Sequence, residues 1–150
     1  MTNIHTKISE DTWNGIAKSF DSTRRKPWKE CIDFINSLSN KSIVADLGSG
    51  NGRHLIPCAN HCKKVIGIDV SKELLRIVQK KIFKAHLDNV ELIHSDAVNI
   101  PLRDLSVDAV LYIATLHNIS ERYRRIKSLK EINNILTLSF TCLFNICLVI

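Results

Sequence analysis

Three glycines at alternate positions follow a short apolar run and an acid. The run is residues 42–45, the acid is Asp46, and the glycines stand at 48, 50 and 52. Glycine reaches positive φ and lets a backbone approach a ligand closely. This order of residues therefore predicts a buried strand that turns sharply into a helix. The free N–H groups of that helix would face a ligand, so the stretch favours a nucleotide site over a plain tight turn.

The glycine spacing separates two kinds of nucleotide site. A dinucleotide fingerprint, Gly-x-Gly-x-x-Gly, would need its third glycine at position 53, where the chain has Arg53. This disfavours an NAD-linked dehydrogenase. The pattern Asp-x-Gly-x-Gly-x-Gly instead resembles motif I of the class I S-adenosylmethionine-dependent methyltransferases. The resemblance implies S-adenosyl-L-methionine as the cofactor, and it implies as cofactor-binding residues Asp46, Gly48, Ser49, Gly50, Asn51 and Gly52.

Polar residues also follow the three later apolar runs. Asp69 ends the run that starts at residue 64, about 20 residues after the turn, where an acid can accept hydrogen bonds from ribose hydroxyls. One such acid is more often a cap, but several at equivalent strand ends favour a site, because ligands of open α/β sheets lie beyond the carboxyl ends of the strands. The further predicted cofactor-binding residues are Asp69, Val70, Asp96, Ala97 and Thr115.

Apolar strands and amphipathic helices alternate along the chain. We predict strands over 42–47, 64–69, 90–94 and 107–113, and helices over 11–20, 27–38, 52–60, 71–85 and 120–136, with Ser71 and Ser120 as N-caps. This alternation predicts an α/β fold with a doubly wound, Rossmann-like sheet, here preceded by two N-terminal helices.

The C-terminal segment departs from the class I pattern, which would give a Gly-Gly turn and a fifth strand after Leu136. Residues 137–150 are instead apolar, β-branched and uncharged. They are too few to span a bilayer comfortably, and they could pair beside the fourth strand as a substitute fifth. We therefore expect a partial methyltransferase domain over residues 1–136, truncated after the fourth or fifth strand, and an atypical tail over 137–150.

Two segments indicate which family within the class I methyltransferases this chain resembles. Residues 22–28, and residues 113–119 with the basic stretch after them, look like the tRNA wobble-uridine carboxymethyl methyltransferases. These enzymes esterify 5-carboxymethyluridine in the anticodon loop and work with a small zinc-binding activator protein. The resemblance implies tRNA and such an activator as partners. Ser49 departs from it where cysteine is common, and so does Asn118, where a second histidine often follows.

Arg24 and His117 are the candidate catalytic residues. A carboxymethyl group is already ionised at pH 7, so its methylation needs positioning rather than a strong base. Arg24 could bind the carboxylate bidentately, and His117 could hydrogen-bond the same group or the uracil. The alternatives are a solvated arginine on a linker and a histidine that caps a turn.

The charge and the cysteine content of the chain limit which partners and which cellular compartment are expected. The net charge is +6, with basic residues concentrated at 24–29 and 122–130; these segments could bind RNA phosphates or form solvated helix faces. Cys58, His61 and Cys62 lack a second ligand pair, so no metal site is predicted. No signal peptide or membrane segment is recognised, and we expect a cytoplasmic protein.

Two other functions stay open at this stage. A small-molecule methyltransferase could share the same cofactor half, although the basic segments and Arg24 disfavour it. An inactive fragment could retain only cofactor binding or association with the activator.

Overall fold

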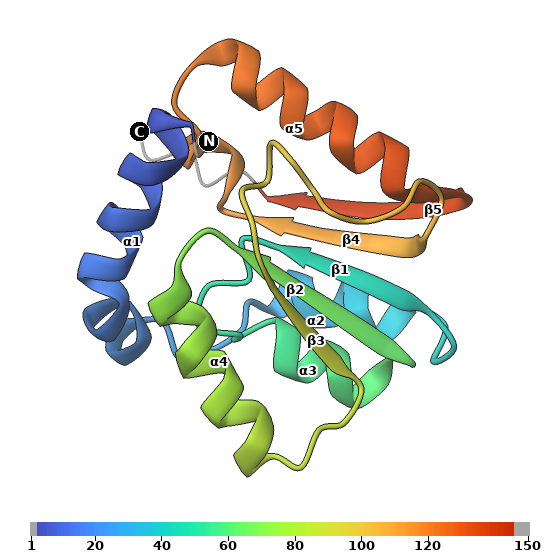
Figure 1. Cartoon of the computed structure of the whole chain (residues 1–150). Coiled ribbons are helices and arrows are strands. Elements are labelled where there is room, and N and C mark those ends of the chain that lie inside the picture. Colours follow the sequence, from blue (N-terminus) through green and yellow to red (C-terminus); the bar gives the residue numbers. More distant parts are fainter. Residues whose placement is uncertain (1–2, 146–150) are drawn as a thin grey trace.

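The computed structural model describes residues 3–145 of the chain, and the side chains of residues 3–137 (Figure 1). In chain order the elements are α1 (Ile4–Thr23), α2 (Lys29–Ser37), β1 (Ile43–Leu47), α3 (Leu55–His61), β2 (Lys64–Asp69), α4 (Lys72–Lys84), β3 (Val90–His94), β4 (Val107–Ile113), η1 (Leu116–Asn118), α5 (Arg122–Ile135) and β5 (Leu136–Asn145). None of the helices among these residues is long and apolar enough to cross a membrane.

The five strands form one parallel sheet in the order β3-β2-β1-β4-β5. This confirms the predicted α/β, Rossmann-like fold. β1 lies at the centre, where Asp46 pairs with Gly67 of β2 and Leu111 of β4. β5 pairs with β4 in the place expected for a fifth strand, and residues 146–150 of the predicted tail lie outside the described residues. Because all pairs are parallel, the carboxyl ends of the strands share one edge.

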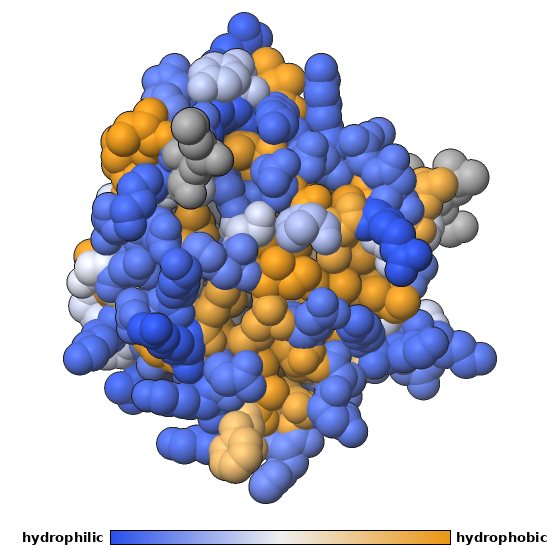
Figure 2. All heavy atoms as spheres, in the orientation of Figure 1, coloured by the Kyte–Doolittle hydropathy of each residue, from blue (hydrophilic) through white to orange (hydrophobic). Residues whose placement is uncertain are grey.

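Apolar residues cover both faces of the sheet. Along β1, Val44 points into a cluster with α2, α3 and α4, whereas Ala45 points into a second cluster with α5 and the segment before β4. This burial on both faces explains why the strands read as nearly continuous apolar runs. Figure 2 shows some of these apolar side chains reaching the surface between α4 and α5, with polar side chains around them.

The predicted strands agree with the structure more closely than the predicted helices do. Ser71 caps α4 as expected, since its side chain accepts a hydrogen bond from the Leu74 N–H at 3.1 Å. The Ser120 cap is wrong: Glu121, at φ 32°, precedes α5 and provides no side-chain cap. α1 begins seven residues earlier than predicted, at Ile4 rather than residue 11, because Asn3 caps it.

α1 lies across the carboxyl edge of the sheet and is attached mainly through polar contacts (Figure 1). Thr6 donates to Asp96 at 2.6 Å. The Asn14 carboxamide oxygen accepts a hydrogen bond from the hydroxyl of Ser71 at 2.8 Å. Since only Glu10 and Ala17 of this helix are buried, these hydrogen bonds specify where the helix sits more than apolar packing does.

One basic residue of the 122–130 segment is buried rather than solvated. Arg124 is 5% exposed, and its guanidinium lies 2.6 Å from the Asp96 carboxylate. Arg125 donates to the carbonyl oxygens of Ile119 and Ser120 at 2.9 and 3.0 Å. The expectation of a uniformly solvated or RNA-facing helix is therefore wrong for these two arginines, which hold α5 against the loops at the carboxyl edge.

Replacing Arg124 with alanine should leave the mostly buried Asp96 carboxylate without the only cation that pairs with it among the described residues. We expect Arg124→Ala to lower the free energy of unfolding by roughly 3–5 kcal/mol, the usual cost of breaking a buried ion pair from one side. Arg122→Ala removes the same charge from an exposed position of the same helix and should change stability by less than about 0.5 kcal/mol. Equal urea denaturation midpoints for the two variants would contradict this assignment.

Candidate active site

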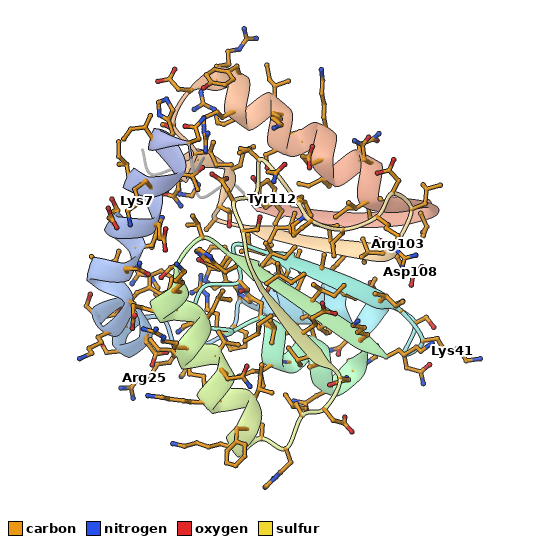
Figure 3. All side chains as sticks on the ribbon, in the orientation of Figure 1. Lys7, Arg25, Lys41, Arg103, Asp108 and Tyr112 are labelled. Atoms are coloured by element: carbon orange, nitrogen blue, oxygen red, sulfur yellow. The ribbon has the colours of Figure 1, made fainter. Side chains whose placement is uncertain are left out.

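A cavity of about 300 Å³ opens at the carboxyl edge of the sheet, beneath α1. Figure 3 shows the side chains of α1 and of the loops after the strands around this edge. The structure brings both candidate catalytic residues and most predicted cofactor residues to the wall of this one cavity. These are Arg24, Gly48, Ser49, Gly50, Asn51, Asp69, Val70, Asp96, Ala97, Thr115 and His117.

The glycine turn after β1 is pressed against the end of β4. Gly48, Gly50 and Gly52 have φ values of 70°, 56° and 78°, a region that side chains rarely adopt. A Cβ on Gly48 would lie 2.2 Å from the hydroxyl oxygen of Thr115. Since such a contact is impossible, glycine is required at position 48 both for its backbone angle and for this close approach.

Asp69 joins the loops that follow β1 and β2. One carboxylate oxygen accepts a hydrogen bond from the Gly50 N–H at 2.8 Å, and the other accepts one from the Ser71 N–H at 2.8 Å. Burial raises the pKa of Asp69, and these backbone hydrogen bonds oppose that rise. Each oxygen retains a lone pair that a ligand hydroxyl can use.

Asp46 and Gly52 are the two predicted cofactor residues that do not line the cavity. Gly52 borders a neighbouring hollow with Lys81. Asp46 is 2% exposed, and its Oδ2 atom has no hydrogen-bond partner. Burial is the larger cause and the nearby Asp69 charge the smaller one that together raise the pKa of Asp46 to about 7. An unpaired buried carboxyl is costly, so the structure has an unused acceptor directly beneath the glycine turn.

Asp96 lines the cavity but already has several partners. Its carboxylate accepts hydrogen bonds from Thr6, from Arg124 and from the Val98 N–H. The acid after β3 thus anchors α1 and α5 as well as bordering the cavity. Sequence reasoning missed this second role, because no spacing pattern relates residues that far apart.

The sequence interpretation also missed an aromatic part of the wall. Trp13 and Phe20, whose ring centroids are 5.7 Å apart and whose planes are perpendicular, line the cavity from α1, and Trp28 lines it from the segment before α2. In the sequence the two α1 residues indicated only an amphipathic helix. Their aromatic character was the available signal, because flat rings are suited to the faces of a nucleobase.

The Cys58, His61 and Cys62 group packs inside the protein. The two sulfur atoms are 3.8 Å apart, and Nε2 of His61 lies 2.8 Å from the Leu38 carbonyl oxygen. Within residues 3–145 no cluster of three residues suited to bind a metal ion occurs.

A parallel sheet in this order, a glycine turn after the central strand and an acid after its neighbour define an α/β domain that binds a nucleotide-like cofactor. Comparison with known proteins names the family. Residues 45–138 match the methyltransferase domain family, and this chain belongs to it.

Three similar proteins illustrate the relationship. The mouse (Mus musculus) tRNA (carboxymethyluridine(34)-5-O)-methyltransferase ALKBH8 is 35% identical over 133 residues, which cover 89% of this chain and 19% of that protein. An S-adenosylmethionine-dependent methyltransferase from Aquifex aeolicus is 27% identical with a TM-score of 0.67, over 79% of this chain and 66% of that one. A chain from a complex of the Haloferax volcanii Trm112 methyltransferase activator with a methyltransferase has a TM-score of 0.72 at 21% identity, over 91% and 58% of the two chains.

The raised pKa of Asp46 makes stability depend on pH. Because the pKa of Asp46 is about 7 in the fold and 3.8 in an unfolded chain, the acid costs no stability below pH 3.8. The cost grows as the pH rises from 3.8 to 7 and is constant at higher pH. Asp46→Asn removes the charge, so we expect the variant to be more stable than the parent at pH 8, by roughly 4 kcal/mol at most.

That advantage should shrink steadily toward pH 4. Thermal or urea unfolding of both proteins between pH 4 and pH 8 measures it. A difference that does not vary with pH would mean that Asp46 has an ordinary pKa in the fold.

Proposed function

We propose that this chain forms the cofactor half of an S-adenosylmethionine-dependent methyltransferase that esterifies the carboxymethyl group of 5-carboxymethyluridine at the wobble position of tRNA. The observation that carries the proposal is that Arg24 and His117, which are far apart in the sequence, line the same cavity as most of the predicted cofactor residues. A site for a carboxylate acceptor thereby adjoins a site for a nucleotide-like cofactor.

The residues on the cofactor side fit S-adenosyl-L-methionine. The positive-φ glycine turn leaves room for backbone contact, and the Asp69 carboxylate has lone pairs for ribose hydroxyls. Beneath the turn, the unpartnered Oδ2 of Asp46 suits the ammonium group of the methionine part. When bound, this cofactor supplies a methyl group activated by a positively charged sulfur.

The acceptor side requires positioning and little proton transfer. The carboxylate of 5-carboxymethyluridine is ionised at pH 7, and its oxygen is the nucleophile. Arg24 would hold that carboxylate through two parallel hydrogen bonds. His117, exposed on η1 at the rim of the cavity, would donate to the same group or to the uracil. Fixing the reacting oxygen in line with the methyl group provides the rate enhancement.

The proposed macromolecular partners are tRNA and a small zinc-binding activator. The name of the ALKBH8 relative and the exposed basic residues Arg25, Lys26 and Lys29 next to Arg24 support the first. The Haloferax complex supports the second. The chain spans about one fifth of the length of the ALKBH8 protein. Both partners are therefore proposals, and so is a cytoplasmic location.

Calorimetric titration with S-adenosylhomocysteine tests the cofactor half. We expect micromolar binding by the 150-residue chain and a loss of about 10- to 100-fold in Asp69→Ala, since the variant removes hydrogen bonds to a charged acceptor. Asp104→Ala changes an exposed acid on the loop before β4 and should leave the affinity unchanged. A folded parent chain that does not bind the ligand would refute the cofactor assignment.

Changing Arg24 to alanine tests the acceptor half. Because Arg24 would orient the substrate rather than the cofactor, Arg24→Ala should slow methyl transfer to carboxymethyluridine-containing tRNA by about 10- to 100-fold while S-adenosylhomocysteine binds as before. Transfer is measured with radiolabelled cofactor in the presence of the activator. A variant that loses cofactor affinity at an unchanged transfer rate would exclude Arg24 as the substrate clamp.

A further inference from the structure

Arg53 has an unusual position directly after the glycine turn. It is half-buried at the wall of the cavity, and its guanidinium carbon lies 4.7 Å from the centroid of the Trp28 ring. In the sequence, Arg53 indicated only that the glycine turn does not have the spacing of a dinucleotide-binding site. Burying part of a guanidinium is costly unless a ring, a hydrogen bond or an anion compensates, so its charge at this place needs a physical reason.

The ring beneath Arg53 is itself held in place. The Trp28 backbone N–H donates to Nε2 of His54 at 3.3 Å, and the two ring centroids are 5.8 Å apart. Burial, and then the Arg53 charge, lower the pKa of His54 to about 4. His54 is therefore neutral near pH 7 and able to accept this hydrogen bond. The neutral histidine positions Trp28, and the Arg53 guanidinium carbon lies over the Trp28 ring.

A second guanidinium faces the same cavity. Arg24 lines it from the end of α1, and after burial its charge is the next largest cause that lowers the pKa of Arg53. Within the described part of the chain, neither side chain donates a hydrogen bond or lies within 4 Å of a carboxylate oxygen. Asp46 attracts Arg53, but its own pKa near 7 makes it a weak counterion. Two mutually repelling cations thus border one cavity without an anion between them.

We propose that Arg53 and Arg24 together bind one carboxylate inside the cavity. The Arg53 guanidinium lies over the Trp28 ring, and N–H groups that donate to no protein group can bind a carboxylate through two parallel hydrogen bonds. This inference rests on the proposed function, since both ligands of the proposed enzyme carry a carboxylate. In the acceptor it belongs to the carboxymethyl group, and in the cofactor it belongs to the methionine part. Arg53 is then a specificity residue that distinguishes an acid from its neutral amide.

Four ligands separate the two sources of the carboxylate. S-Adenosylhomocysteine carries the amino-acid carboxylate, and 5′-methylthioadenosine lacks it. An anticodon stem-loop with 5-carboxymethyluridine carries the substrate carboxylate, and the same RNA with 5-carbamoylmethyluridine is its neutral counterpart. Binding of each is measured calorimetrically to the parent chain, to Arg53→Gln and to Arg24→Gln. Arg24 is exposed, so its variant should fold even where Arg53→Gln does not.

A charge-matched control is available at the other end of the sheet. Arg103 is exposed on the loop before β4, far from α1 in Figure 3. Arg103→Gln should bind all four ligands like the parent, so that any loss in the other variants is not an effect of net charge.

We expect each of the two arginine variants to lose at least tenfold in affinity for one carboxylate ligand and to bind its neutral counterpart unchanged. Loss confined to the carboxymethyl RNA assigns the carboxylate to the acceptor. Loss confined to S-adenosylhomocysteine assigns the carboxylate to the cofactor, and it replaces the role of substrate clamp proposed above for Arg24. Unchanged affinity for all four ligands in both variants would overturn the inference. A parent chain that binds neither adenosine compound refutes the proposed function first, and the carboxylate site with it.

Discussion

The site depends on one close approach: the glycine turn after β1 lies against the ends of its two neighbouring strands. Gly48 and Ser49 donate to the Ile68 carbonyl oxygen at 2.7 and 3.1 Å on the β2 side. On the β4 side Gly48 leaves no room for a Cβ beside Thr115. Through this contact the ends of β1, β2 and β4 form one wall of the cavity. The cavity has room for a ligand because the glycine turn packs closely against the ends of the neighbouring strands.

Buried charge gives the same edge its chemical character. Asp46 and Asp69 are nearly inaccessible to water, and burial together with the Asp69 charge raises the pKa of Asp46 to about 7. A fold that maximised stability alone would have amides or apolar groups here. Retaining two acids beneath a glycine turn costs stability, and the cofactor binding proposed above would account for that cost.

α1 connects the two halves of the proposed activity. Its polar attachment through Thr6 and Asn14 places Trp13 and Phe20 over the cofactor side, while Arg24 at its end faces the acceptor side. A helix held mainly by hydrogen bonds can be displaced more readily than one buried in the core. In the proposed activity, substrate and cofactor would therefore meet beneath a helix in which only Glu10 and Ala17 are buried.

The sequence by itself determined the strands, the glycine turn and the acids, because strand burial and positive-φ turns depend on residues adjacent along the chain. β2, β3 and β4 were predicted to the residue for this reason. The tertiary structure alone decided that Arg124 pairs with Asp96, that Ser120 does not cap α5, and that Arg53 stacks on Trp28 beside Arg24. Each depends on how separate elements pack in space, which periodicity and local spacing do not encode.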